Sequence, residues 1–229
     1  MPKVKLFAAI PRRKDVSRQE FHDHWRHPHG TMGRRISILR KYVQGHQFDH
    51  EVLGPDQTRY EGIAEAWMDS IADAEYFPSE PVYAREVIPD EPLFIDLPNL
   101  KFLIATEEVL VSAPRGALLE PTGNRDWFDD DRAVNIKLVQ LIEEEGTQPW
   151  QSDEDALLGE RIGALRHVRC LPAAEIHGDA PPFLGVRELW WPTLSAFNEG
   201  MAADRAAFDT LVGRPARAFT ALVQAERFK

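Results

Sequence analysis

The sequence predicts an α+β fold of two tandem ferredoxin-like βαββαβ units, packed sheet against sheet as an intrachain barrel. Three observations lead to this prediction. The order of strands and helices expected in residues 1–112 recurs in residues 133–229. Glu-Ala-Trp at 65–67 aligns with Glu-Leu-Trp at 188–190. Residues 113–132 are rich in turn formers and acidic side chains, so we interpret them as the linker between the halves.

The elements of the first half follow from apolar patterning and capping signals. A nearly continuous apolar run predicts a strand over 4–10, and Ser17 with Glu20 three positions later forms a capping box that begins a helix at Arg18. Pro28 and Gly30 interrupt this helix. The other predictions are strands over 40–49, 60–68 and 101–111, a helix over 69–84 broken by Pro78 and Pro81, and short helical turns over 85–100.

The second half repeats this order with little sequence identity. Glu108 aligns with Glu226, and the pair Asp90 and Phe94 aligns with Asp204 and Phe208, which supports a duplication with a period of about half the chain. The predicted elements are a strand over 134–142, a helix over 153–164 capped by Ser152, strands over 166–176 and 183–191, a helix over 194–201 and a strand over 216–228.

Composition excludes several classes of protein. A net charge of −10 argues against nucleic-acid binding, and no stretch approaches the roughly 18 apolar residues that span a bilayer. The single cysteine, Cys170, excludes an internal disulfide and predicts a small core residue. We expect a cytoplasmic protein, and association into a homo-oligomer stays open. Residues 1–50 carry an excess of basic side chains, which either cover a solvated helix face or attract an anionic or phenolate substrate.

Residues 19–46 contain most of the candidate catalytic side chains, because this segment combines several histidines with aromatic residues. Imidazoles beside aromatic rings suggest proton transfer on an apolar ligand. Phe21 and Trp25 share one helix face, and alternation along the next strand places its polar side chains together. The candidate catalytic residues are His29, His24, His46, Tyr42 and Glu65, and the candidate substrate-binding residues are Trp25, Trp67, Arg40 and Phe21.

Each candidate also has a purely structural interpretation. His29 could cap its turn on a backbone carbonyl, and His46 could be a satisfied core or rim histidine. Burial would raise the pKa of Glu65 and make it a general base, unless it forms an ion pair with Arg40 on the neighbouring strand. Trp67 could simply fill the core between the sheets.

Three motifs resemble the EthD family. They are E-F-H-x-x-W-R-x-x-H-G over 20–30, R-x-Y-V-Q-x-H over 40–46, and D-E-x-x-F-I-D followed by F-L-x-x-T-E-E over 90–108. The resemblance covers residues 3–112 and implies a dimeric α+β barrel. The second half lacks the H-G element and looks like a degenerate copy, so we expect the chemistry in the first half.

The leading functional hypothesis is a cofactor-independent acid–base enzyme, of the lyase, isomerase, dehydratase or cyclase type. Its substrate would be a small hydrophobic compound, aromatic or carbonyl-bearing, from a catabolic or polyketide-like pathway. No H-E-x-x-H motif, carboxylate triad or glycine-rich phosphate loop occurs, so we expect no metal and no cofactor. The alternatives are a non-enzymatic protein that binds a small aromatic ligand, and a cofactor-free monooxygenase.

Overall fold

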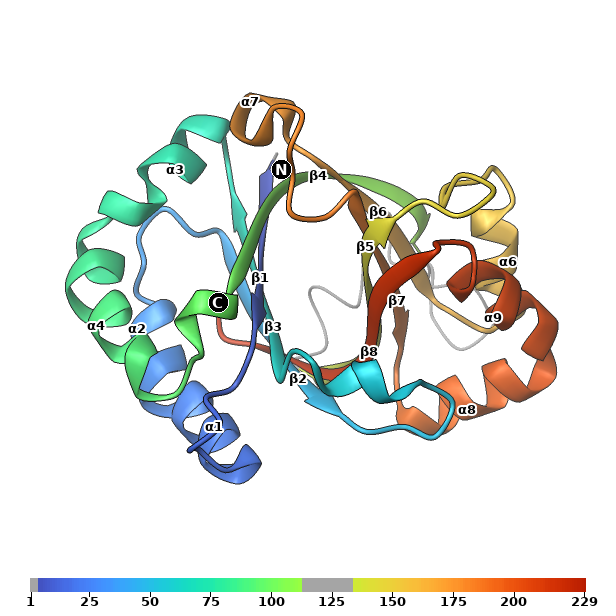
Figure 1. Cartoon of the computed structure of the whole chain (residues 1–229), viewed down its shortest axis with the longest axis horizontal. Coiled ribbons are helices and arrows are strands. Elements are labelled where there is room, and N and C mark those ends of the chain that lie inside the picture. The colour runs from blue at the N-terminus through green and yellow to red at the C-terminus, as the bar shows by residue number, and fades with distance from the viewer. Residues whose placement is uncertain (1–3, 113–133) are drawn as a thin grey trace, which may run out of the picture.

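Eight antiparallel strands close into one barrel in the computed structural model, which describes residues 4–112 and 134–229 (Figure 1). The strand order around the barrel is β1-β3-β2-β8-β5-β7-β6-β4. The strands are β1 (Val4–Ile10), β2 (Lys41–Phe48), β3 (Gly62–Met68), β4 (Lys101–Ser112), β5 (Val134–Glu144), β6 (Arg166–Pro172), β7 (Gly185–Trp191) and β8 (Arg217–Arg227). The predicted α+β barrel of two tandem units is therefore confirmed. The predicted linker 113–132 lies outside the described residues, so the domain boundaries stay a prediction.

Each half of the chain contributes one four-stranded sheet with the same strand order. The N-terminal sheet is β4-β1-β3-β2, and the C-terminal sheet is β8-β5-β7-β6. The barrel closes where β2 pairs with β8 and where β4 pairs with β6. These two junctions are equivalent, since each joins the fourth strand of one half to the second strand of the other. The backbone N–H and C=O groups on the edge strands of each sheet are therefore paired with those of the other sheet.

The residue register confirms the internal duplication. Lys5 lies opposite Trp67 in the first half, and Lys137 lies opposite Trp190 in the second. The predicted alignment of the two Glu-x-Trp segments is thus correct in three dimensions. The predicted equivalence of the two late glutamates also holds, because Glu108 lies opposite β6 and Glu226 lies at the corresponding position opposite β2.

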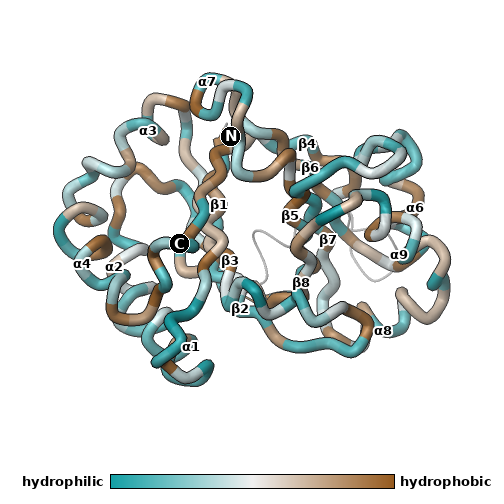
Figure 2. The backbone as a smooth tube through the Cα atoms, in the orientation of Figure 1, coloured by the Kyte–Doolittle hydropathy of each residue, from teal (hydrophilic) through white to brown (hydrophobic). Residues whose placement is uncertain are grey.

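The barrel interior combines apolar packing with a buried ionic network. Hydrophobic segments recur along β1 and β5 (Figure 2), yet Lys5, Lys137, Glu65 and Glu188 all have side chains that are at most 2% exposed. Lys5 Nζ lies 2.7 Å from Glu65 Oε2 and 2.5 Å from Glu188 Oε2, and Lys137 contacts both glutamates. The predicted alternative of a Glu65–Arg40 ion pair is wrong, since the barrel lysines, from β1 and β5, take that role.

This network balances its charges within the barrel. Burial alone would raise the pKa of Glu188, but Lys137 and Lys5 lower it to about 2. Burial likewise disfavours the ammonium of Lys5, but the surrounding carboxylates, led by Glu188 and Glu65, raise its pKa well above the usual value. Glu188 and Lys5 are therefore both charged at neutral pH.

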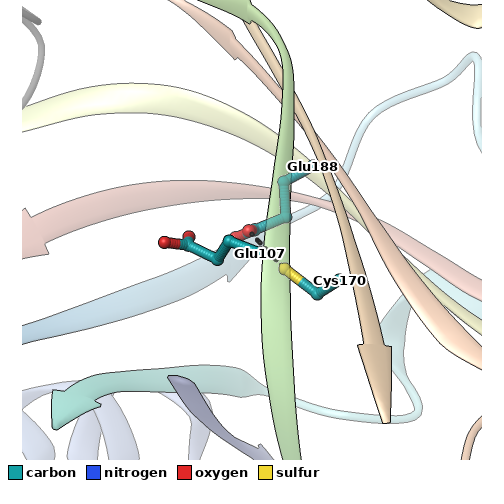
Figure 3. Close-up of side chains that lie close together, drawn as sticks. All are labelled: Glu107, Cys170 and Glu188. Carbon is teal, nitrogen blue, oxygen red and sulfur yellow. Dashed lines mark hydrogen bonds between the residues drawn. The ribbon is translucent and has the colours of Figure 1, made fainter. Parts of the chain in front are cut away.

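Cys170 lies beside Glu188, one of the network's two glutamates, and close to Glu107, as Figure 3 shows. It is fully buried, as predicted for a core residue, and its thiol lies 3.6 Å from Glu188 Oε2. The thiol and the carboxylates of Glu107 and Glu188 lie within 4.8 Å of one another, a spacing that a metal ion could bridge. However, Lys5 Nζ lies 3.3 Å from Glu107 and 2.5 Å from Glu188, so an ammonium already supplies the positive charge there.

Helices cover the outer faces of the two sheets on opposite sides of the barrel (Figure 1). Their inner faces form one apolar core with each sheet, separate from the core inside the barrel. The helices of the first half are α1 (Arg18–His24), α2 (Gly30–Gly33), α3 (Ile71–Tyr76) and α4 (Ile88–Asp90), with a π-helical segment at Trp25–His29 and another at Tyr83–Val87. Those of the second half are α6 (Asp155–Arg161), α7 (Ala174–His177), α8 (Leu194–Ala203) and α9 (Arg205–Val212).

Three segments differ from the sequence prediction. The predicted strand over 166–176 ends at Pro172, whose missing amide cannot continue the ladder, and α7 follows. Helix α9 was not predicted, although Asp204 caps it by accepting a hydrogen bond from the amide of Ala207. In α6 the expected cap is absent at Ser152, and the helix begins later, after Glu154.

The helix that carries the histidines bends where the sequence predicts an interruption. Both hydrogen bonds of the predicted capping box, between Ser17 and Glu20, are present at its start. His27 has extended backbone angles (φ −146°, ψ 119°), as expected for a residue that precedes proline. Helical geometry resumes at His29, so the break is a kink rather than an end. The kink directs His29 towards the sheet, where it is only 6% exposed.

Candidate active site

A pocket of about 60 Å³ lies between the outer face of the N-terminal sheet and the helices that cover it. Its walls are apolar apart from the titratable side chains His29, Tyr42, Tyr83 and Glu91. Phe102, which is 39% exposed, lines one end, so the pocket reaches the surface there. A small enclosure with apolar walls and a few polar groups is typical of a small-molecule site.

Small side chains on β3 create this space. Ala64 and Ala66 point away from the barrel and line the pocket. The equivalent positions on β7 hold Arg187 and Leu189, which are fully buried. Arg187 fills the corresponding volume of the second half and bonds to Asp155 there, at 3.2 Å. The difference supports the expectation that the first half carries the chemistry.

The two halves nevertheless share the glycine that brings a helix close to the sheet. A Cβ atom at Gly62 would lie 2.3 Å from the ring of Trp25, and one at Gly185 would lie 2.3 Å from the ring of Trp150. In both halves an indole therefore packs directly on strand backbone. Trp25 thereby forms one wall of the pocket.

His29 faces the pocket with one ring nitrogen held by a carboxylate. Its Nδ1 lies 2.8 Å from Asp90 Oδ2, and His24 Nε2 lies 2.9 Å from Asp90 Oδ1. Burial alone would raise the pKa of Asp90, but the hydrogen bonds from His29 and His24 hold it below the usual value. Asp90 is therefore ionised at neutral pH. No side chain within residues 4–112 or 134–229 hydrogen-bonds to Nε2 of His29, which is left for a ligand.

A second carboxyl group, Glu91, lines the same pocket. Its Oε1 accepts a hydrogen bond from Tyr83 Oη at 3.1 Å. Burial raises the pKa of Glu91 to about 7, the neighbouring charge of Asp90 adds to this effect, and the hydrogen bond from Tyr83 opposes it. Adjacent residues of the chain thus present an ionised carboxylate and a carboxyl group that is partly protonated at neutral pH.

Tyr42 and Trp25 complete the polar lining. Tyr42 Oη accepts a hydrogen bond from Gln44 Nε2 at 2.8 Å, and the same amide donates to the carbonyl of Trp25 at 2.7 Å. Burial raises the pKa of Tyr42 to about 12, so its phenol is neutral. The buried indole nitrogen of Trp25 has no hydrogen-bond partner in the described part of the chain. An oxygen atom of a bound molecule would satisfy it.

His46, predicted to assist His29, does not line the pocket. It packs against Trp25 with ring centroids 4.6 Å apart, and its Nδ1 lies 2.8 Å from Nδ1 of His22. Burial lowers the pKa of His46 to about 2, with positive charge nearby contributing, so it is neutral. His22 in turn lies 3.3 Å from Glu61. This pair joins α1 to β2 and lies outside the pocket lining.

Four other predicted site residues also lie elsewhere. Glu65 and Trp67 point into the barrel, where the Trp67 indole nitrogen donates to Glu107 at 3.0 Å. Phe21 is fully buried in the core beneath the first helix and is not part of the pocket lining. Arg40 is exposed and pairs with Asp69. Of the predicted residues, His29, Tyr42 and Trp25 line the pocket. His24 does not line it, but it bonds to the carboxylate of Asp90, which also bonds to His29.

Three residues of the candidate site escaped prediction. Asp90 and Glu91 stand in the motif D-E-x-x-F-I-D, and this motif was the signal that could have identified them. Tyr83 has no comparable signal, because a tyrosine within a proline-interrupted helical region is usually a packing residue. The contact of Tyr83 with Glu91 is evident only from the folded structure, in which its hydroxyl group donates to Glu91 Oε1.

Several solved structures share the fold of this chain at very low sequence identity. An anthrone oxidase-like protein is 9% identical, with a TM-score of 0.59, and the match covers 100% of this chain and 94% of that one. A candidate monooxygenase from Fusobacterium nucleatum is 7% identical with a TM-score of 0.54, covering 98% and 92%. Another from Lactobacillus acidophilus is 8% identical with a TM-score of 0.51, covering 100% and 95%. A search of curated protein sequences finds no match.

These likenesses define the class of fold, a dimeric α+β barrel that is completed here within one chain. Residues 13–98 match the family model of the EthD domain. This match lies within the region where the motifs predicted a resemblance, and most residues that line the pocket fall inside it. Every helix within residues 4–112 and 134–229 falls short of the length and hydropathy that a bilayer crossing requires.

Proposed function

We propose that the protein is a cofactor-independent acid–base enzyme that acts on a small, flat, hydrophobic compound bearing a carbonyl group or an aromatic ring. The observation that carries this proposal is the pairing of His29 with Asp90 at an apolar pocket. A histidine whose second nitrogen is held by an ionised carboxylate is a common general base.

The geometry accounts for proton abstraction by His29. Asp90 accepts the Nδ1 proton, which leaves the lone pair of Nε2 available to a substrate. When Nε2 takes up a proton, the nearby negative charge of Asp90 stabilises the imidazolium that forms. His24 shares the carboxylate, so it keeps Asp90 in place while the base changes its protonation state.

The volume and the lining of the pocket limit the size and the polarity of the substrate. A volume of about 60 Å³ is roughly that of two water molecules at about 30 Å³ each, so a ketone the size of 2-indanone must displace surrounding side chains or extend through the open end beside Phe102. The unpartnered indole N–H of Trp25 and the neutral phenol of Tyr42 favour a ligand that carries an oxygen atom. The apolar lining favours a neutral or weakly acidic compound over a highly charged one.

The test is exchange of carbon-bound hydrogen in 2-indanone, a small flat ketone, followed by proton NMR in deuterium oxide. We expect the protein to accelerate exchange and the variant His29→Ala to reduce the rate by a factor on the order of 10². The matched control is His27→Ala, because His27 is exposed on the same kinked helix and should leave the rate unchanged. Binding without any acceleration would support the ligand-binding alternative instead.

A cofactor-free monooxygenase is the second candidate, favoured by the fold shared with an anthrone oxidase-like protein and with candidate monooxygenases. The same base would generate a carbanion, which dioxygen would then oxidise. An oxygen electrode separates the two functions. Exchange that proceeds equally well without oxygen supports the acid–base enzyme, whereas substrate loss that matches oxygen uptake supports the monooxygenase.

A further inference from the structure

We propose that Glu91 is a second catalytic residue, a general acid that donates its proton to the carbonyl oxygen of the substrate while His29 removes a proton from the adjacent carbon. This inference rests on the proposed function and narrows it, since it identifies the substrate class as small ketones with an acidic C–H bond beside the carbonyl group.

The placement of Glu91 suits this role. Glu91 follows Asp90 directly in the chain and begins a short 3₁₀ turn over Glu91–Leu93, so α4 delivers both carboxyl groups to the same site. Both His29 and Glu91 line the pocket. Tyr83 occupies Oε1 of Glu91, and no group within residues 4–112 or 134–229 is hydrogen-bonded to Oε2. A substrate oxygen can therefore reach an unoccupied carboxyl oxygen.

The surroundings of Glu91 favour its neutral form. The titratable groups that face it are Asp90 from α4, Tyr83 from the π-helical segment, and His29 and Tyr42 across the lining. Burial and the negative charge of Asp90 both oppose ionisation of Glu91, so a substantial fraction carries its proton at neutral pH. Neighbouring carboxyl groups with different protonation states are a recurring arrangement in acid–base sites.

The proposed step is enolisation. His29 Nε2 takes the proton from carbon, and the electron pair of the broken C–H bond forms the carbon–carbon double bond of the enol. The π electrons of the carbonyl group move to its oxygen, which receives the proton of Glu91. The products are the enol, the imidazolium of His29 and the carboxylate of Glu91, so charge and atoms balance. Return of the two protons in the opposite sense regenerates the ketone.

The experiment measures the pH dependence of 2-indanone exchange in the wild-type protein, Glu91→Gln and Tyr83→Phe. We expect the wild-type rate to fall on the alkaline side with a midpoint near pH 7, where the Glu91 carboxyl group loses its proton. Glu91→Gln should remove this alkaline decrease and lower the maximal rate by a factor on the order of 10². Glu86→Gln is the matched control, because Glu86 pairs with Arg35 at the surface.

Tyr83→Phe provides a test that does not depend on replacing the acid. The hydrogen bond from Tyr83 lowers the pKa of Glu91, so its loss should move the alkaline midpoint to higher pH. If Glu91→Gln does not fold, this shift decides the question. An unchanged alkaline profile in Tyr83→Phe, or in a folded Glu91→Gln, would overturn the role of Glu91. If His29→Ala still reduced the exchange rate as expected, the proposed function would stand, but without a catalytic role for Glu91.

Discussion

Replacing Lys137 with methionine should destabilise the barrel strongly at neutral pH. The ammonium of Lys137 contacts Glu65 and Glu188, and all three side chains are at most 2% exposed. Its loss leaves two buried carboxylates to share the single ammonium of Lys5. Removing one partner from a buried ion pair costs about 3–5 kcal/mol, a large part of the roughly 5–15 kcal/mol that holds a domain together.

The same network should make the stability of the wild-type barrel depend on pH through Glu188. Lys137 and Lys5 lower the pKa of this carboxyl group from its usual 4.5 to about 2, against the opposing effect of burial. A lowered pKa contributes stability above pH 4.5 that is lost as the pH falls towards 2. In Lys137→Met the pKa of Glu188 should rise, so the variant should lose less stability than the wild type over this acidic range.

Urea unfolding at pH 7, followed by tryptophan fluorescence, measures the free energy of unfolding directly. We expect a loss of about 3–5 kcal/mol for Lys137→Met, with an unchanged dependence on urea concentration. Adding Glu65→Gln to the variant should recover part of the loss, since it restores charge balance. Lys101→Met, at an exposed position on β4, serves as the control and should change stability by less than about 0.5 kcal/mol. A loss below 1 kcal/mol in Lys137→Met would refute the reasoning.

Three further predictions concern the N-terminal half. Gly62→Ala should lower the free energy of unfolding by about 1–3 kcal/mol, because its Cβ would overlap the ring of Trp25, whereas Gly54→Ala meets no atom within 4 Å and should have little effect in the same urea titration. Ala66→Leu should fill the pocket and abolish 2-indanone exchange with the circular dichroism spectrum unchanged; undiminished exchange would place the site elsewhere. Ser17→Ala removes the side-chain cap of α1 and should lower the melting temperature by the equivalent of about 1 kcal/mol; no change would mean that the cap is not needed.

The strands and the first helix could be predicted because their signals are local. The apolar run of β1 and the capping box before α1 depend on neighbours a few positions away. The Glu-x-Trp repeat revealed the duplication, because two copies of one fold keep the same residues on the same face. Helix α9 was missed since its cap at Asp204 follows another helix immediately, without a turn signal between them.

The site was predicted only in part because its partners are distant in sequence. His29 was identified from its position at a helix interruption, but Asp90 lies 61 positions away and only the fold brings them to 2.8 Å. The ion-pair partner of Glu65 was wrongly predicted for the same reason. Its partner Lys137 comes from the other half of the chain, 72 positions away, and no local pattern indicates a lysine at the centre of an apolar barrel.

Because both halves of the barrel belong to one polypeptide, they can accumulate different substitutions. In a barrel made of two identical chains, a change that fills one pocket, such as arginine in place of Ala64, is copied into both. Here Arg187 occupies the equivalent position of one half alone, where it bonds to Asp155. A single chain can thus hold a rigid, ion-paired support in one half and an open pocket beside Ala64 in the other.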